Sequence, residues 1–556
     1  MNPTRTASGR FADVLAEATV AARRAGDRDR GLRFVKTALR QIDETTDPHR
    51  AAWFWLQRSR AVRYYNGTFG VPELERARRL VEGRRPSPIQ ADVLSRIAAN
   101  GMLTGPSVEH IEVAERAAAI ARQVGARTVE LHALLTLGTL RCDFGEIEGG
   151  VAGLRKVCQA AAELGDPDLH CRAFINLASL LEQVGRSAEA LEVAREGMEV
   201  SLQSGMIRYN GSLLAGNIAE PLIALGRHEE AARLLAEWEE RPAAIIHDDF
   251  LDRLRGELAL LGDDPAAAAR RLTAARTGSD ISQPQKSLPA ADLAVRIAVR
   301  TGRFAEARSE LLQALGEGFP IGFEHFCWPL LFHGVSAEAD SRGLPAADAA
   351  RPETLARVRS AAAALSRAVP LYEGWALLLD AELARAEGVH TPGPWLAAVE
   401  ALRSTGRPYP LALALLRAAE AQAAAGARAE AGTLLREAER TGRCCGDVHL
   451  LREIAVLAER ARLPLADRPV AAEPAVLPEP QDPAVALGLT ARERDVLRLL
   501  ALGRTNRQIA EELYISPKTA SVHVSNILAK LAVTGRGEAA AVAHRMRLFP
   551  DVAATG

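Results

Sequence analysis

One phrase recurs along most of this chain: a glycine, a short polar turn, and then an alanine-rich segment with apolar residues at helical spacing. Its copies begin at Gly145, Gly185, Gly226, Gly262, Gly302 and Gly426, with a weaker copy at Gly26. The five copies from 145 to 302 follow one another at 40, 41, 36 and 40 residues. A glycine readily takes the left-handed conformation that closes a helix, and a period near 40 residues built of two helices indicates a helical solenoid. We therefore expect stacked helix pairs that share one continuous core.

Residues 10–460 show apolar side chains at three- and four-residue spacing, which predicts helices, and no alternating pattern predicts a strand. Aromatic residues make up only 4% of the chain, whereas strands favour aromatic and β-branched side chains. No apolar run approaches the roughly 18 residues that a membrane span needs. The six cysteines show no disulfide framework. The sequence thus predicts an all-α protein of the reducing cytoplasm without a membrane segment.

The clearest copy of the phrase spans residues 176–191 and reads Asn-Leu-Ala-Ser-Leu-Leu-Glu-Gln-Val-Gly-Arg-Ser-Ala-Glu-Ala-Leu. It resembles a tetratricopeptide repeat, in a form longer than the usual ~34 residues. The resemblance is good for 130–310 and weak for 1–130 and 310–400. It implies a helical array with a concave face, and we expect that face to bind a protein partner, a peptide or a small-molecule effector. A scaffold without a site of its own is the competing interpretation.

The composition changes after this array. Residues 463–488 are rich in proline and carry four acidic residues against one arginine, which favours an extended linker over a packed core. Residues 489–547 carry ten Lys and Arg against five Asp and Glu, while the rest of the chain is mildly acidic. We therefore predict an array over 1–462, a linker over 463–488 and a small basic domain over 489–550. A basic module at one end points towards nucleic acid.

Helix-start signals divide the terminal domain into four helices. Capping boxes over 490–493 and 505–508 open the first two, and Ser516 before Pro517 is a favoured start for the third. Glycines precede a fourth helix over 538–547. Two short helices joined by a tight turn, the second with a polar outer face, have the geometry of a helix-turn-helix.

The third predicted helix has the features of a major-groove reader. Small and polar side chains on its outward face would enter the groove without clash, and the amides at its start would hold a phosphate. Flanking cations would contact the DNA backbone and make the affinity salt-dependent. The outward side chains are Lys518, Ser521, Val522, Ser525, Asn526 and Lys530.

Three stretches of the domain closely resemble the LuxR-type, NarL/FixJ-like DNA-binding domain. They are Leu-Thr-Ala-Arg-Glu-Arg-Asp-Val-Leu from 489, Gly-Arg-Thr-Asn-Arg-Gln-Ile-Ala from 503, and Leu-Tyr-Ile-Ser-Pro-Lys-Thr-Ala-Ser-Val-His-Val-Ser-Asn-Ile-Leu-Ala-Lys-Leu from 513. The match covers about 60 residues and four helices. It implies that the third helix reads the major groove and that the fourth, over 538–547, pairs two domains on an inverted repeat.

The resemblance implies a role for each matching position. Base edges would be read by Ser521, Val522 and Ser525. Phosphates would be contacted by Thr505, Ser516, Lys518, Thr519, His523, Asn526 and Lys530. Thr505 and Ser516 are helix caps first, and a partly packed surface position suits His523 equally well. The family usually has valine at 520 and often lysine at 521, where this chain has alanine and serine, so base discrimination is expected to be modest or water-mediated.

An array followed by a LuxR-type domain resembles the C-terminal half of large ATP-binding LuxR regulators of the MalT-like kind. An NTPase domain precedes the array in those proteins, but this chain has no Gly-x-x-x-x-Gly-Lys-[Ser/Thr] stretch. We expect no ATP and no other cofactor to bind; an NTPase domain was either lost or lies outside this sequence. The expected partners are double-stranded DNA, a second copy of the chain, RNA polymerase and an effector on the array.

Enzyme functions have little support. Residues 323–333 bring His325, Cys327 and His333 together, but bulky apolar neighbours favour a packed helix over a metal site. The adjacent Cys444 and Cys445 fit free thiols better than a redox pair, and no Ser-His-Asp or paired-carboxylate arrangement stands out. We predict a non-enzymatic, sequence-specific transcriptional regulator, and an activator by the family's commoner habit. The alternative is a solenoid adaptor that binds proteins and in which the terminal domain is subsidiary.

Overall fold

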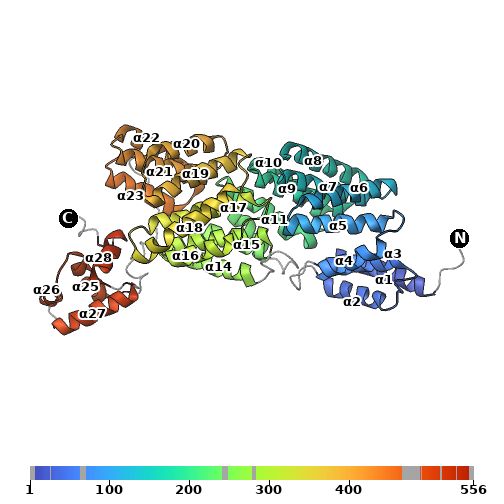
Figure 1. Cartoon of the computed structure of the whole chain (residues 1–556), viewed down its shortest axis with the longest axis horizontal. Coiled ribbons are helices and arrows are strands. Elements are labelled where there is room, and N and C mark those ends of the chain that lie inside the picture. The colour runs from blue at the N-terminus through green and yellow to red at the C-terminus, as the bar shows by residue number, and fades with distance from the viewer. Residues whose placement is uncertain are drawn as a thin grey trace. The chain divides into compact units, whose positions relative to one another are not determined.

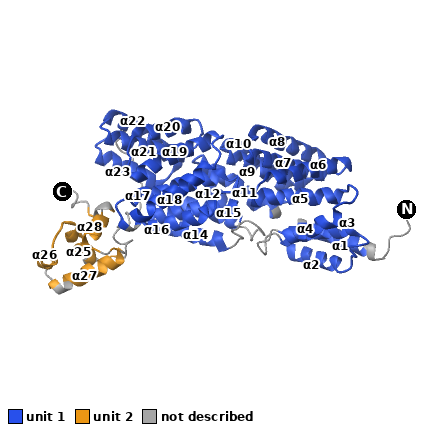
Figure 2. Ribbon diagram, viewed as in Figure 1, with its two compact units in different colours: residues 1–467 blue, residues 468–556 orange. Residues whose placement is uncertain are grey.

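The computed structural model describes residues 7–549 except 26, 63–69, 241–247, 278–282, 466–488, 490, 514–515, 532, 534 and 547. This described part contains 27 helices and no strand, so the predicted all-α fold is confirmed. The chain divides into two compact units, residues 1–467 and 468–556 (Figure 2). The linker expected over 463–488 lies outside the described residues except for its first three. Within the described part, no helix has both the length and the apolar character that crossing a membrane requires.

The first unit is a tetratricopeptide-like array of helices joined by short turns (Figure 1). Its first twelve helices are α1 Ala7–Arg24, α2 Arg28–Leu39, α3 Pro48–Val62, α4 Val71–Val81, α5 Pro88–Thr104, α6 Val108–Gln123, α7 Arg127–Asp143, α8 Ile147–Leu164, α9 Pro167–Gln183, α10 Ser187–Gln203, α11 Ile207–Ala224 and α12 His228–Glu239. The others are α13 Asp248–Leu261, α14 Pro265–Thr277, α15 Pro284–Arg300, α16 Phe304–Leu315, α17 Glu324–Asp340, α18 Pro345–Ala363, α19 Pro370–Glu387, α20 Pro392–Arg403, α21 Pro408–Ala424, α22 Arg428–Cys445 and α23 Val448–Arg460.

Left-handed glycines close successive turns in the middle of this array. They recur every 20 or 21 residues and have φ angles between 66° and 96°. The six are Gly125, Gly145, Gly165, Gly185, Gly205 and Gly226. The recurring phrase therefore marks every second turn, and the structural half-period is one helix of about 20 residues.

The expectation of a left-handed glycine at position 262 is wrong. The left-handed residue of that turn is Asp263, with φ of 63°. Helix α14 begins three residues after Gly262, whereas the helices after Gly185 and Gly302 begin two residues after the glycine. The additional residue moves the bend onto an aspartate, which tolerates this conformation better than most side chains. Its carboxylate forms an ion pair with Arg452, 2.7 Å between Oδ2 and Nη1.

The array also brings together helices that are far apart in the sequence. A Cβ built on Gly226, in the turn after α11, would lie 2.3 Å from the carbonyl oxygen of Cys444 in α22. Arg407, just before α21, pairs with Glu182 of α9 at 2.8 Å across 225 residues of sequence. We call this contact of the α9–α12 turns with the α20–α22 turns the seam. Glycine is required at 226 for two reasons, its positive φ and this close backbone approach.

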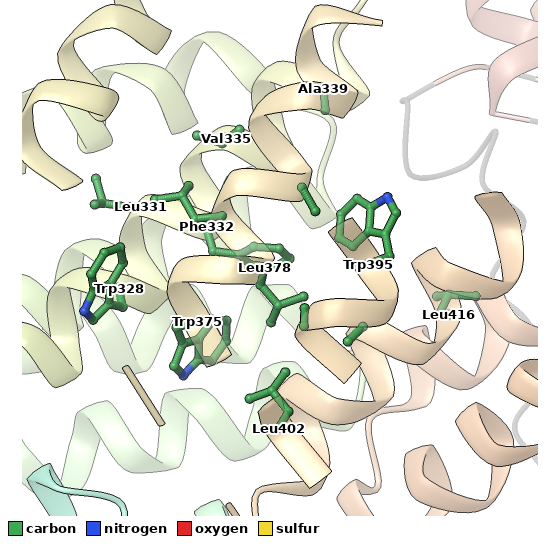
Figure 3. Packing of buried hydrophobic residues seen from close by; sticks show 14 of the residues in the cluster. Trp328, Leu331, Phe332, Val335, Ala339, Trp375, Leu378, Trp395, Leu402 and Leu416 are labelled. Atoms are coloured by element: carbon green, nitrogen blue, oxygen red, sulfur yellow. The ribbon is translucent and has the colours of Figure 1, made fainter. Parts of the chain in front are cut away.

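The largest core cluster lies where the repeat resemblance is weak. Trp328 of α17 is fully buried, and its indole nitrogen donates a hydrogen bond to the carbonyl of Ser366 at 3.1 Å. Phe332 and Trp375 pack with ring centroids 5.6 Å apart, and Trp395 and Leu402 of α20 lie in the same cluster (Figure 3). Large aromatic side chains replace the alanine phrase here, and this is why the sequence pattern fades while the helical architecture continues.

The second unit is a four-helix domain. Its helices are α25 Ala491–Ala501, α26 Asn506–Glu512, α27 Pro517–Lys530 and α28 Arg536–Arg545. Four apolar residues of α25 are buried: Val496, Leu497, Leu499 and Leu500. They pack with Ile509, Val524 and Ile527 in one core. The first predicted capping box includes Thr490, which lies outside the described residues.

The fourth helix begins two residues earlier than predicted, at Arg536 rather than 538, and ends at Arg545 rather than 547. Gly537 therefore sits in its first turn, where a glycine costs only about 1 kcal/mol and does not stop a helix. The Arg536 guanidinium donates a hydrogen bond to the carbonyl of Arg504, so the start of α28 is tied to the turn before α26.

Candidate nucleic-acid interface

Helix α26 begins with the predicted capping box. The Thr505 hydroxyl accepts a hydrogen bond from the Gln508 amide at 3.4 Å, and the Gln508 side chain accepts one from the Thr505 amide at 2.9 Å. The Asn506 side-chain amide then donates to the Ser521 hydroxyl of α27 at 3.0 Å. This hydrogen bond joins the first turn of α26 directly to α27, the second helix of the helix-turn-helix.

Helix α27 separates its two faces as the sequence predicts. Val524 and Ile527 are buried in the domain core. Ser521, Val522 and Ser525, the three predicted base readers, are all exposed and lie on the same face, at spacings of one and four residues along the helix. The Val522 side chain is 52% exposed, although it is apolar and sits in a small domain. An exposed surface of short side chains on one helix is what entry into a major groove requires.

The Ser521 hydroxyl is already engaged within the domain. It donates a hydrogen bond to the Pro517 carbonyl at 3.0 Å and accepts one from Asn506 at 3.0 Å. A hydroxyl has one proton and two lone pairs, so one acceptor site is left. In this geometry Ser521 can accept a hydrogen bond from a base but has no proton to give.

The predicted phosphate contacts have different environments. Thr505, Ser516 and Asn526 are exposed. His523 is partly buried, and its Nδ1 is enclosed without a hydrogen-bond partner in the described part of the chain. For Lys518 and Thr519 the structure describes the backbone as the first turn of α27, but their side chains lie outside the described atoms.

Lys530 has an intramolecular partner. Its Nζ lies 2.6 Å from Oε2 of Glu493, whose side chain is 5% exposed. Glu493, expected in a capping box, thus connects the start of α25 with the end of α27. Nothing in the sequence spacing signals this pair, because the two residues are 37 positions apart.

One exposed cation beside this face was not singled out from the sequence. The Arg507 side chain, in the first turn of α26, is 85% exposed and forms an ion pair with Glu511 at 3.3 Å. In a helix-turn-helix the first helix crosses the DNA backbone. The position of Arg507 in that helix was the available signal.

The His and Cys residues of 323–333 and the Cys444–Cys445 pair lie in surroundings typical of structural residues. In α17, His333 Nδ1 lies 2.6 Å from Asp292 Oδ1, and its Nε2 lies 3.1 Å from the Tyr409 hydroxyl. Cys327 is fully buried among apolar side chains. Cys444 and Cys445 are free thiols. Among the described residues, no group of three or more His, Cys, Asp and Glu side chains is arranged to hold a metal ion.

The terminal domain matches a known protein family and several known proteins. The family described as bacterial regulatory proteins, luxR family, matches residues 487–543. Transcriptional regulatory protein LiaR of Bacillus subtilis is 52% identical over 60 residues, which are 11% of this chain and 28% of that protein. Spore germination protein GerE of the same organism is 48% identical over 58 residues, which are 10% of this chain and 78% of that protein.

A solved structure aligns with most of the chain at low sequence identity. A crystal structure of Rap protein complexed with competence and sporulation factor aligns over 80% of this chain and 99% of that one, with 13% identity and a TM-score of 0.32. The sequence relatives, in contrast, match the terminal domain, and the chain spans less than a third of the length of LiaR. On the evidence of that domain, with its helix-turn-helix geometry and its match to 78% of GerE, the chain belongs to the luxR family of bacterial regulatory proteins.

Proposed function

We propose that this protein is a transcriptional regulator of the cytoplasm that binds double-stranded DNA through α27 and has no enzymatic activity. The observation that carries this proposal is the exposed face of α27, where Ser521, Val522 and Ser525 lie together at the surface of the domain. LiaR, one of the relatives that match this domain, is a transcriptional regulatory protein.

Base reading is assigned to three side chains. Ser521 accepts a hydrogen bond from an exocyclic amine of adenine or cytosine, because its own proton is held by Pro517. Val522 packs against a thymine methyl group, and Ser525, one helical turn further, donates or accepts. All three side chains are short, so the preference for particular DNA sequences is moderate and depends on bridging waters and on DNA shape.

Backbone contacts position the domain on the duplex. They come from Thr505, Ser516, Lys518, Thr519, His523 and Asn526, to which we add Arg507 at the start of α26. Lys530 reaches a phosphate only by giving up its contact with Glu493, so its contribution to affinity is smaller than that of Lys518.

Two copies bind an inverted repeat by pairing through residues 538–547. Ala539 and Ala543 on one side of α28 pack into the core of their own domain, whereas Ala541 is exposed on the other side. The array senses a partner or an effector and controls the terminal domain, and the bound regulator activates transcription through RNA polymerase.

Genome-wide mapping of bound sites, followed by titration of the full chain on the mapped DNA, tests the proposal. We expect enriched sites that share an inverted repeat, and an affinity that falls steeply with salt. Absence of any DNA binding at low salt would overturn the proposal and favour the adaptor. The Arg195→Gln variant, which changes an exposed arginine of α10 in the array, is the matched control and should bind as the wild type does.

A further inference from the structure

Ion pairs connect the second helices of successive pairs in the array, the even-numbered helices. An arginine of one second helix pairs with a glutamate of the next, 34 or 35 residues further along the chain. Each of these guanidinium groups therefore has its counter-charge within the array. The pairs are Arg155–Glu189 at 2.6 Å, Arg195–Glu230 at 3.3 Å and Arg276–Glu310 at 2.8 Å.

Helix α2 departs from this pattern. It is the second helix of the first pair and lies at the N-terminal end of the array (Figure 1). Residues 28–40 contain five Lys and Arg against one Asp. Four of these cations are exposed and form no ion pair with any residue of the described chain: Arg30, Arg33, Lys36 and Arg40.

The four cations lie on one side of the helix. At about 100° per residue they fall within an arc of about 120°, and Arg40, the C-cap, keeps helical backbone angles. Gly31, Val35 and Ala38 are buried on the opposite side. From Arg30 to Arg40 the row of cations is about 15 Å long. We call these four side chains the α2 stripe.

The acidic side chains close to α2 in the sequence leave this stripe positive. Asp27 caps the helix through its first-turn amides. Glu44 accepts a hydrogen bond from the Trp55 indole at 2.7 Å and pairs with Arg76. Asp29 is the one anion on the same face, so four cations stand against one anion. Two further carboxylates bond to their sequence neighbours, Asp43 to Thr45 and Asp47 to Arg50.

Cations this close together on one helix repel one another. Successive members of the α2 stripe are three or four residues apart, the spacings at which like charges oppose helix formation. The Arg30 guanidinium lies over the Phe34 ring, 5.7 Å from its centroid, which holds the group in place without neutralising it. A stripe that opposes the stability of its own helix fits a ligand that supplies the missing negative charge.

Duplex DNA has the charge density that this stripe requires. It carries one phosphate charge per ~1.7 Å of axis, so about nine lie along the length of the stripe. A helix that binds a membrane surface would expose its apolar side. The apolar side of α2 is buried instead, and no large apolar side chain is exposed within its described residues.

We propose that the α2 stripe is a second DNA-binding surface, which holds phosphates of the duplex without reading bases. Its contribution is affinity and salt dependence, with no sequence preference. The proposal rests on the proposed function only in taking DNA as the polyanion. It gives the array a direct part in DNA binding, in addition to sensing.

The test measures binding of the full chain to a random-sequence duplex of roughly 40 base pairs, about four helical turns, over a series of salt concentrations. The variant R33Q/K36Q/R40Q should bind about tenfold more weakly at low salt. Its slope of log affinity against log salt should fall by about two to three, because about 0.9 is lost for each phosphate contact. An unchanged slope would overturn the proposal.

A matched triple variant removes the same charge elsewhere. R116Q/K156Q/R270Q changes exposed cations of α6, α8 and α14 and should keep the wild-type slope. Equal losses in the two triple variants would show a general effect of net charge and contradict a local contact. The conservative variant R33K/R40K should keep both affinity and slope. The unfolding temperature of the free R33Q/K36Q/R40Q chain should be no lower than that of the wild type, because repulsion has been removed.

Two further measurements separate this proposal from its alternatives. Lys518→Ala lowers the slope by about one if α27 docks as proposed, whatever the α2 stripe does, so the two DNA contacts fail independently. Binding of the wild type and R33Q/K36Q/R40Q chains is also measured on anionic phospholipid vesicles and on polyglutamate. A loss confined to the vesicles or to polyglutamate, with no difference on DNA, would overturn the proposal and assign the stripe to a membrane or to an acidic protein.

Discussion

Lys530 Nζ lies 2.6 Å from Glu493 Oε2, and this contact joins the end of α27 to the start of α25. The Glu493 side chain is almost fully enclosed, whereas that of Lys530 is 36% exposed. An enclosed carboxylate that loses its cation is costly, but the exposed side of this pair lets water compensate in part. The pair therefore contributes to the stability of the domain more than to its affinity for DNA.

Replacing Lys530 should separate stability from DNA affinity. We expect Lys530→Gln to destabilise the terminal domain by about 1–2 kcal/mol, measured by denaturant unfolding. The slope of log affinity against log salt should stay close to the wild-type value. Lys518→Ala is the comparison and should lower that slope by about one while leaving stability unchanged. If Lys530→Gln lowers the slope as much as Lys518→Ala does, Lys530 is a phosphate contact in its own right.

The close packing at the seam predicts that a glycine-to-alanine substitution costs more stability at Gly226 than at Gly145. Gly145 and Gly226 both have positive φ, so alanine at either costs about 1–2 kcal/mol. At Gly226 the new methyl group would also meet the Cys444 carbonyl, whereas at Gly145 it meets nothing within 4 Å. We expect Gly226→Ala to destabilise the array by a further ~1–3 kcal/mol in calorimetric unfolding. Equal losses for the two variants would show that the seam does not hold the array together.

The partly buried His132 predicts a dependence of array stability on pH. Its pKa is lowered in the folded protein by burial, by Arg172 and, more weakly, by Arg60 and Arg96, with Asp168 acting the other way. The unfolded chain takes up a proton below about pH 6.5 that the folded chain does not, so stability is lost as pH falls through that value. Between pH 6.5 and 5.5 we expect a loss of about 1 kcal/mol from this group. The variant His132→Asn should lack this component, and an unchanged pH profile in the variant would contradict the assignment.

Because the Ser521 hydroxyl can only accept a hydrogen bond, we predict that the bound DNA has a preferred base opposite it. Selection of DNA from a random pool should enrich adenine or cytosine at the position that Ser521 faces, since these bases present an amine in the major groove. Ser521→Ala should flatten the preference at that position and lower nonspecific affinity little. Ser525→Ala is the matched substitution one helical turn away and should flatten a different position. Enrichment of guanine opposite Ser521 would mean that the hydroxyl proton is redirected on binding.

Much of the architecture could be predicted from the sequence because each helix carries its own signals. The capping box at Thr505 and Gln508 and the apolar face of α27 are local patterns, and the structure confirms both. The half-period of the array was also visible in Gly125, Gly165 and Gly205, although the phrase around them is too varied to stand out. The bend at Asp263 was mistaken for one at Gly262, because a one-residue insertion shifts the turn without changing its composition.

The remaining features depend on contacts between distant parts of the chain. Lys530 meets Glu493 across 37 residues, and Arg407 meets Glu182 across 225. No local pattern specifies such pairs, because they arise only once the helices have packed. The predicted base readers, by contrast, are consecutive or one turn apart on a single helix.

Methylation interference on a mapped binding site tests the docking of α27 most directly. Dimethyl sulfate methylates guanine N7 in the major groove and adenine N3 in the minor groove, so it distinguishes the two grooves. We expect methylated guanines at two symmetric half-sites to block binding of the full chain, and methylated adenines between them to leave it unchanged. Interference confined to adenine N3, or none at either base, would show that this helix does not lie in the major groove.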